Sequence, residues 1–287
     1  MFVELGDYKW AHPKPTWDNV GVKVYECHIG MAGVEEKVHG FDHFREEVLP
    51  RIAGLGYNVI QIMGVVEHPY YGSFGYHCSS YFSVASRLGT PLQFKQLIDE
   101  AHRRGIKVII DIVHSHAAKN VNEGINMWDG SDYQYFHGGE KGLHPLWDSR
   151  VFDYSKYEVL RFLLSNIRYW LEEFNADGFR FDGVTSMLYQ HHGKNFGFTG
   201  NYQEYFNAQL DLDALAYLTL ANHLAHSLCP QAILIAEDVS GFPGLCRSIE
   251  DGGIGFGFRL AMAVPDMWIR LLKESKDEDW NVWEISH

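Results

Sequence analysis

Apolar, strand-like runs alternate along this chain with longer segments in which apolar residues recur at helical spacing. Six such runs stand at residues 22–30, 58–66, 107–114, 178–183, 232–239 and 255–262. Most are nearly continuous in apolar residues, which is typical of parallel strands buried on both faces. The alternation therefore predicts an α/β fold with a parallel sheet covered by helices.

The segments between the runs carry helix signals. Thr90 and Pro91 predict the cap and the first turn of a helix that ends at Gly105. Further helices are expected near 41–54, 155–175, 204–228 and 244–250, and from Pro265 to about 274. Six units fall short of the eight that close a TIM (β/α)8 barrel. We therefore expect an incomplete barrel whose seventh and eighth strands are missing from this chain.

The chain divides into a short lead and one large unit. Residues 1–20 are a polar, proline-bearing lead, and 21–287 form the partial barrel. Within the barrel, residues 115–154 are far longer than the connection of about 2–6 residues that usually joins a strand to a helix. Loops of that length are usually functional, so we expect 115–154 to be a long excursion after the third strand.

Composition narrows the class of partner. The formal net charge is −13 and 15% of the residues are aromatic. A phosphate backbone or an anionic membrane surface would repel this charge, so neither nucleic acid nor a membrane is expected as a partner. Aromatic rings suit stacking on sugars, although most aromatic residues belong to a core.

Cysteine usage and the absence of an apolar leader indicate the compartment. The four cysteines form no CxxC pair, and no stretch of about 18 apolar residues occurs. This favours a cytoplasmic protein without a disulfide framework, a structural metal or a cofactor. The full-length protein is expected to be a monomer.

Charged residues stand where three of the strands end. Asp182 and Glu237 stand near the ends of two of the runs, and two carboxylates on neighbouring strand ends are the minimum apparatus for breaking a glycosidic bond. Arg180 lies two residues before Asp182 and so projects to the same side, where it would keep that carboxylate ionised. Glu237 ends an apolar run, which suits a raised pKa and an acid/base role. Alternatively, Arg180 and Asp182 form a structural ion pair.

A second group of polar residues has two readings. Asp111, His114 and His116 lie close together in the sequence at the end of the third run. This spacing resembles that of a zinc or iron site, and such a site would need a further ligand such as Asp182 or Glu237. Alternatively, His116 donates a hydrogen bond to a substrate hydroxyl while Asp111 holds its neighbours in place.

Three stretches, DIVHSHAAKN, DGFRFDGVTSMLYQHHG and IAEDVSG, resemble motif blocks of the α-amylase superfamily, in particular its eukaryotic glycogen and starch branching enzymes. The match runs from about Val24 to Trp280. The resemblance implies that Asp182 is the nucleophile of a covalent β-glucosyl intermediate and Glu237 the general acid/base. It also implies an α-glucan polysaccharide as the substrate and a role in glycogen biosynthesis.

The same resemblance implies the residues that hold the sugar. Arg180 would orient the nucleophile, Asp111 and His116 would contact the sugar, and Tyr76 would stack beneath it. His114 is the additional histidine of that subfamily and is grouped with these substrate-binding residues. The 115–154 segment would correspond to the small excursion domain that shapes the glucan cleft.

Two departures from the family pattern leave alternatives open. Gly257 replaces a residue that is usually acidic, and the HD pair of the seventh strand has no counterpart before His287. The leading hypothesis is a 1,4-α-glucan branching enzyme, with the truncated chain alone expected to be inactive. The alternatives are a non-catalytic, glucan-binding isoform, an α-amylase-like hydrolase and, least favoured, a metal-dependent hydrolase.

Overall fold

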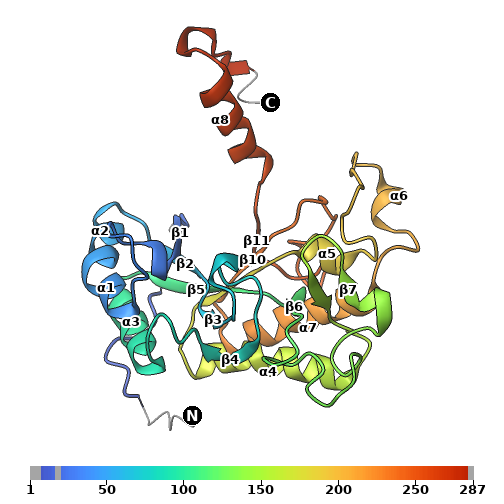
Figure 1. Ribbon diagram of the computed structural model, residues 1–287. Coiled ribbons are helices and arrows are strands. Elements are labelled where there is room, and N and C mark those ends of the chain that lie inside the picture. Colours follow the sequence, from blue (N-terminus) through green and yellow to red (C-terminus); the bar gives the residue numbers. More distant parts are fainter. Residues whose placement is uncertain (1–7, 17–20, 284–287) are drawn as a thin grey trace.

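The computed structural model describes residues 8–16 and 21–283, so parts of the expected lead and His287 lie outside the described residues. A parallel sheet of six strands forms its centre, confirming the six predicted strands. The order is β1 (Val24–His28), β2 (Val59–Met63), β5 (Lys107–Ile112), β9 (Gly178–Phe181), β10 (Ile233–Ala236) and β11 (Phe258–Arg259). The sheet curls and the helices lie outside it, which makes the fold an incomplete TIM barrel (Figure 1).

Alternation along the strands separates two faces of the sheet. Val108, Ile110 and Phe179 belong to the large core under the helices. Ile109 and Ile235 belong instead to a small apolar cluster on the other face. Because successive side chains of a strand point to opposite faces, the residues two positions beyond Ile109 and Ile235 also face that second, concave side.

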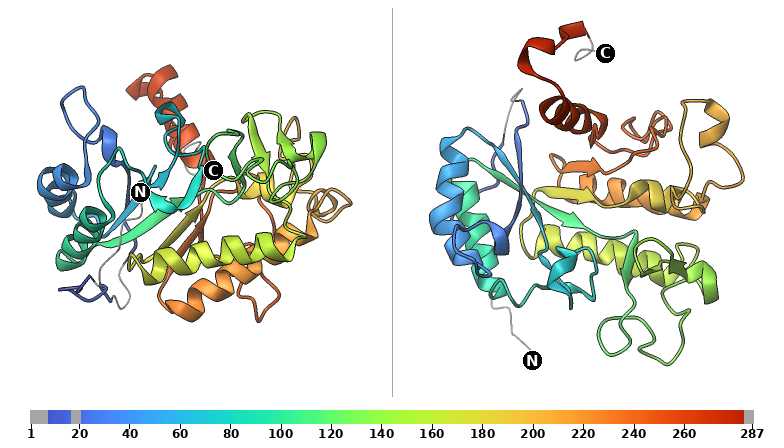
Figure 2. Two further views of the ribbon diagram at one scale, coloured as in Figure 1. Left: turned by 60° about the horizontal axis from the view of Figure 1, so that its bottom comes forward. Right: turned by 45° about the horizontal axis from the view of Figure 1, so that its top comes forward.

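Most of the predicted helices are present with close bounds. They are α1 (Phe41–His43), the π-helical turn Phe44–Val48 and α2 (Leu49–Gly54), α3 (Pro91–Arg103), α4 (Tyr157–Glu172), α7 (Leu212–Leu228) and α8 (Ala263–Glu274). The predicted cap of α3 is confirmed, because the Gln93 amide donates to Thr90 Oγ1 and the Thr90 amide donates to Gln93 Oε1. Figure 2 shows α2, α3, α4 and α7 on the outside of the sheet, whereas α8 stands apart from it.

Two helix predictions were wrong. The stretch near 204–228 is not continuous: α6 (Tyr202–Tyr205) ends early, and Asp211 starts α7 by accepting a hydrogen bond from the Ala214 amide at 2.9 Å. The expected helix near 244–250 is a series of turns. Gly244 has a φ of 81°, and the Arg247 amide closes a turn onto its carbonyl. A left-handed glycine interrupts helical geometry at that point.

The 115–154 segment has secondary structure of its own. Its strands β6 (His116–Ala118), β7 (Leu143–His144) and β8 (Ser149–Val151) form an antiparallel sheet in the order β6-β8-β7. Between β2 and α3, the strands β3 (Val66–Glu67) and β4 (Ser80–Val84) form a hairpin that the sequence did not predict. Short 3-10 turns occupy Ile29–Met31, Tyr71–Ser73, Gly139–Gly142 and Asp277–Asp279.

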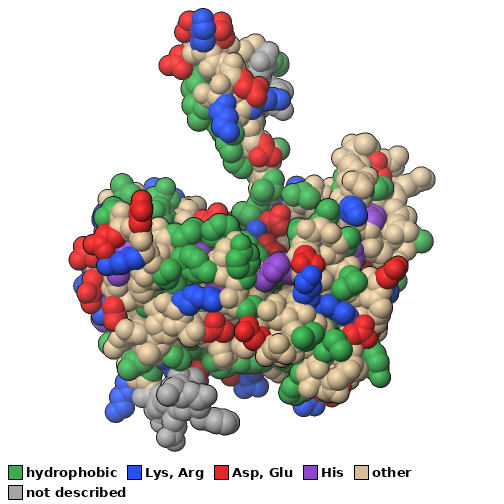
Figure 3. Space-filling model, viewed as in Figure 1, with side chains coloured by type: hydrophobic (Ala, Val, Ile, Leu, Met, Phe, Trp, Pro, Cys, Tyr) green, Lys and Arg blue, Asp and Glu red, His purple; other side chains and the backbone are tan. Residues whose placement is uncertain are grey.

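The last helix stands apart from the rest. In Figure 3, α8 projects away from the body and carries apolar side chains on its surface. Trp268, Ile269 and Leu272 of this helix are exposed. Among the described residues, no helix combines the length and the apolarity required to cross a membrane.

Candidate active site

Strand alternation brings three predicted residues to the concave face of the sheet. Asp111 and Glu237 lie two positions beyond Ile109 and Ile235, which belong to the concave cluster. Arg180 lies opposite Asp111 in the register of β5 and β9. The ends of three neighbouring strands therefore carry their charged side chains on one side of the sheet.

The Arg180 guanidinium joins two carboxylates. Its Nη1 atom lies 2.8 Å from Asp111 Oδ1 and 2.7 Å from Asp182 Oδ1. The same guanidinium lies over the Tyr76 ring, 5.7 Å from its centroid, and the Tyr76 hydroxyl donates to Asp111 Oδ2 at 2.9 Å. Four side chains from three separate parts of the sequence thus form one connected polar network.

Burial and charge oppose each other in this network. Burial raises the pKa of the Asp182 carboxyl, while the Arg180 charge acts to lower it. Burial likewise raises the pKa of Asp111, to about 7, again against the influence of Arg180. Since both carboxyls share one guanidinium, Arg180 is the group that favours their ionised forms.

Glu237 is held by the backbone that follows β9. The Gly183 amide donates to Glu237 Oε2 at 2.8 Å, and the Val184 amide donates to the Glu237 carbonyl at 2.9 Å. Burial, and next the charge of Asp182, raise the pKa of Glu237, whereas Arg180 and the Gly183 amide act to lower it. A raised pKa keeps this carboxyl protonated at higher pH, as a general acid requires.

Both carboxylates line the same cavity of about 630 Å³. Five of the predicted residues contribute to its wall: Tyr76, His116, Arg180, Asp182 and Glu237. The remaining lining residues are Tyr70, Gly72, Ser73, His77, Leu146 and Trp147. A concave site with aromatic walls and a few convergent polar groups is the usual form of a ligand-binding site.

His116 reaches the cavity wall with both ring nitrogens engaged. Nε2 lies 2.7 Å from the Tyr76 carbonyl and Nδ1 lies 2.9 Å from Ser115 Oγ. Burial lowers the pKa of His116 to about 3, so the ring is neutral. Because a carbonyl oxygen can only accept, Nε2 carries the proton and donates to Tyr76, and Nδ1 accepts from the Ser115 hydroxyl. The imidazole therefore supports the backbone of Tyr76.

His114 does not line the cavity. It is buried, with Nδ1 at 2.5 Å from the Tyr217 hydroxyl and Nε2 at 2.9 Å from Asn166 Oδ1. Tyr217 and Asn166 belong to α7 and α4, so His114 connects the strand to the helices outside the sheet. Asp111 also lies behind the cavity wall, where it contacts Arg180 and Tyr76.

The sequence did not single out the other six lining residues. Trp147 and Leu146 come from the 115–154 segment, and His77 comes from the loop before β4. Tyr70, Gly72 and Ser73 lie in or beside the 3-10 turn Tyr71–Ser73 that follows β3. The available signal was the aromatic and histidine content of these loops, but composition does not tell which ring turns inward.

The described residues hold no group of three or more histidine, cysteine, aspartate or glutamate side chains placed to bind a metal ion. His114 uses both ring nitrogens on Tyr217 and Asn166. The arrangement of Asp111, His114 and His116 in this chain is therefore not that of a metal centre.

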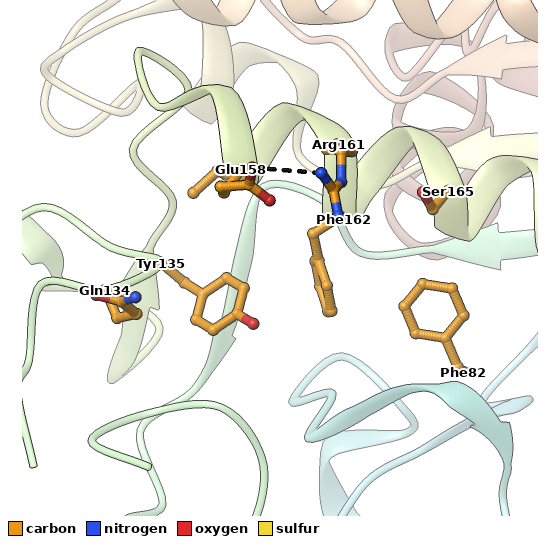
Figure 4. A pocket seen from close by; sticks show the side chains of 8 residues that line it. Phe82, Gln134, Tyr135, Glu158, Arg161, Phe162 and Ser165 are labelled. Atoms are coloured by element: carbon orange, nitrogen blue, oxygen red, sulfur yellow. Dashed lines mark hydrogen bonds and ion pairs between the residues drawn. The ribbon is translucent and has the colours of Figure 1, made fainter. Parts of the chain in front are cut away.

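A second cavity, of about 410 Å³, lies on a different part of the surface. Figure 4 shows its aromatic side chains, Phe82, Tyr135 and Phe162, beside the Glu158–Arg161 ion pair. Phe82 belongs to β4, Tyr135 to the 115–154 segment and Phe162 to α4. This cavity shares no lining residue with the one that contains Asp182 and Glu237.

Comparisons with known proteins agree with the sequence motifs. Residues 46–150 match the family described as "Alpha amylase, catalytic domain". The chain is 59% identical over 278 residues to a protein of Felis catus named "1,4-alpha-glucan-branching enzyme", an alignment that covers 97% of this chain and 40% of that protein. For the protein of the same name from Solanum tuberosum, the identity is 55% over 282 residues, with coverage of 97% and 33%. The chain thus spans two fifths or less of the length of these relatives.

Solved structures show the same fold at low sequence identity. A maltogenic α-amylase, AmyB from Thermotoga neapolitana, superposes with a TM-score of 0.62 at 21% identity, covering 89% of this chain and 52% of that one. An α-amylase from Geobacillus thermoleovorans, solved with acarbose, also has a TM-score of 0.62, at 18% identity with coverage of 84% and 51%. These likenesses establish the barrel fold.

Proposed function

This chain belongs to the α-amylase family, and on that premise we propose that it forms the nucleophile-bearing part of a 1,4-α-glucan-branching enzyme. The proposed reaction cleaves an α-1,4-glucosidic bond with retention and transfers the glucan segment to a 6-hydroxyl, which creates an α-1,6 branch. The observation that carries this proposal is the shared cavity of Asp182 and Glu237. A retaining mechanism requires two such carboxyls facing one glycosidic bond.

In the first step, Asp182 attacks the anomeric carbon while Glu237 donates its proton to the leaving glycosidic oxygen. The bond to the leaving glucan breaks as the bond to Asp182 forms. Glu237, then ionised, removes the proton from the 6-hydroxyl of an acceptor chain. That oxygen attacks the anomeric carbon and releases Asp182, so the configuration is retained after two inversions.

The surrounding residues suit these roles. Arg180 holds Asp182 at 2.7 Å and favours its ionised, nucleophilic form. Tyr76 and His116 lie in the wall of the cavity, where we propose that they contact the sugar, and Asp111 supports Arg180 and Tyr76 from behind. His114 is proposed to act indirectly, because its hydrogen bonds to Tyr217 and Asn166 hold the chain at the end of β5 in position.

An assay on amylose tests the proposal. The protein expressed from its complete coding sequence should lower iodine staining while releasing little reducing sugar. D182N and E237Q should each abolish this change, whereas E250Q, which removes an exposed carboxylate, should not. Abundant reducing ends would indicate an α-amylase-like hydrolase, and glucan binding without any turnover would indicate a non-catalytic isoform.

The wider setting is also a proposal. We place the reaction in glycogen biosynthesis, in the cytoplasm, with the 115–154 segment acting as the excursion that shapes the glucan cleft. Leu146 and Trp147 of this segment line the cavity, which supports that role. Fractionation of cells and sedimentation of the purified protein test the expected compartment and the expected monomer.

A further inference from the structure

Trp147 lines the cavity that holds Asp182 and Glu237. Its ring stacks on the His144 imidazole, with centroids 4.0 Å apart and planes 6° apart. On another side, the ring centroid of His116 lies 4.9 Å away. The indole is only partly buried, although the His144 ring behind it is 1% exposed.

His144 is fixed by hydrogen bonds on both ring nitrogens. The Trp147 amide donates to Nδ1 at 3.2 Å, which makes Nδ1 the acceptor, and Nε2 then donates to Ser186 Oγ at 3.1 Å. Burial lowers the pKa of His144 to about 3, which agrees with a neutral ring. Because Ser186 lies on α5 (Val184–Leu188), directly after the loop that holds Asp182, His144 ties the 115–154 segment to the end of β9.

The far edge of the indole lies against Gly183. A Cβ atom added at Gly183 would come within 3.0 Å of Trp147 Cη2 and within 3.2 Å of Cζ3. Gly183 is also the residue whose amide holds Glu237. The Trp147 ring is therefore placed beside the backbone that links the two carboxylates.

We propose that Trp147 is a substrate-binding residue whose indole face stacks on a sugar ring of the glucan next to Asp182, with His144 as its positioning residue. The inference rests on the proposed function and adds a named contact to the glucan site. A pocket residue that served only to fill space would not need a buried, doubly hydrogen-bonded imidazole behind its face. Flat aromatic faces are the natural partners of the apolar faces of sugar rings, and a fixed ring binds without a large loss of side-chain entropy.

Oligosaccharide binding to a variant that cannot turn over its substrate tests the role of Trp147 directly. In an E237Q background, where turnover is blocked, calorimetry with maltoheptaose should show affinity about tenfold weaker for W147A than for the parent. W147F should retain most of the affinity, whereas W147L should lose as much as W147A. Leucine and phenylalanine both cover Gly183, but only phenylalanine offers an aromatic face. W128A is the matched control, because Trp128 is exposed in the same segment and does not line the cavity.

The positioning role of His144 has its own readout. H144F keeps a flat ring behind Trp147 and should bind maltoheptaose more tightly than H144A, even where both melt at a lower temperature than the parent. Equal affinity for W147L and W147F, or no measurable binding by the E237Q protein, would overturn the inference. Failure of an oligosaccharide-binding protein to form branches on amylose would instead overturn only the proposed function.

Discussion

The Gly183 amide donates a hydrogen bond to Glu237 Oε2 at 2.8 Å, so the turn after β9 holds the carboxylate that follows β10. Gly183 adopts a φ of 64°, in the left-handed region that favours glycine. This geometry aims the amide at the neighbouring strand end. The relative position of the two proposed catalytic carboxyls therefore depends on one residue between them and on its backbone conformation.

Gly183→Ala should impair both stability and activity. The left-handed conformation costs an alanine about 1–2 kcal/mol, and the new methyl would press on Ser115 Oγ and the Trp147 ring at 3.0 Å. Gly56→Ala is the matched control, since Gly56 has a φ of 80° with no atom within 4 Å of the added Cβ. Denaturant unfolding and the amylose assay should show a comparable backbone cost for both variants, with activity lost only in G183A. Equal activity in the two variants would contradict this account of Gly183.

Arg180→Gln should be strongly destabilising. It leaves the buried Asp111 and Asp182 carboxylates without their shared partner, and breaking a buried ion pair costs about 3–5 kcal/mol. Arg168→Gln breaks an exposed pair with Glu172 on α4 and should change stability far less, because water screens that pair. Urea unfolding measures both variants. A similar small loss in each would show that Arg180 is not what stabilises this network.

The raised pKa of Glu237 predicts how stability changes with pH. A carboxyl whose pKa is higher in the folded state than in the unfolded state binds the proton more tightly when folded. Its contribution is fully present below the ordinary pKa of 4.5 and is lost as pH rises through the folded pKa. The difference in unfolding free energy between wild type and E237Q should therefore fall as pH increases from about 4.5.

Unfolding curves of wild type and E237Q at a series of pH values give this difference. E250Q serves as the control for a Glu-to-Gln change, because the Glu250 carboxylate is exposed. A wild-type advantage that grows with pH would mean that the folded structure favours the ionised form of Glu237, which is opposite to the acid/base role.

His114→Ala should act on stability more than on substrate affinity. It removes hydrogen bonds to Tyr217 and Asn166 in a fully buried place, and leaving such partners unsatisfied costs about 1–3 kcal/mol. Unfolding and KM measured on the same preparation separate the two effects. An increased KM at unchanged stability would instead place His114 among the residues that contact the sugar.

The sheet and most of its helices were predictable because their signals are local. The apolar runs that predict β2 and β5 and the capping box at Thr90 depend on residues close together in the sequence. The two helix predictions that were wrong lie where a glycine or an additional helix cap interrupts the helical spacing of apolar residues. At Gly244 a left-handed backbone replaces the expected helix with turns, and at Asp211 a side-chain cap starts a helix that the apolar pattern alone would begin earlier.

The candidate site was predictable only in part, for the same reason. Because successive side chains of a strand point to opposite faces, Arg180 and Asp182 were expected on the same side. The structure places Arg180 Nη1 2.7 Å from Asp182 Oδ1. No local pattern could show that Arg180 also reaches Asp111, because that contact depends on the register between β5 and β9. Trp147 was missed because a ring in a long loop enters the cavity only after the loop folds.

Trapping the covalent intermediate tests the central claim most directly. In the protein carrying E237Q, a fluorinated α-maltosyl fluoride supplies a leaving group that needs no acid catalysis, so the glycosyl-enzyme should form and persist. Mass spectrometry of the digested protein should then find the added sugar on Asp182. A label on another residue, or none while the wild-type protein turns the reagent over, would contradict the assignment of Asp182 and Glu237 to one cavity and one bond.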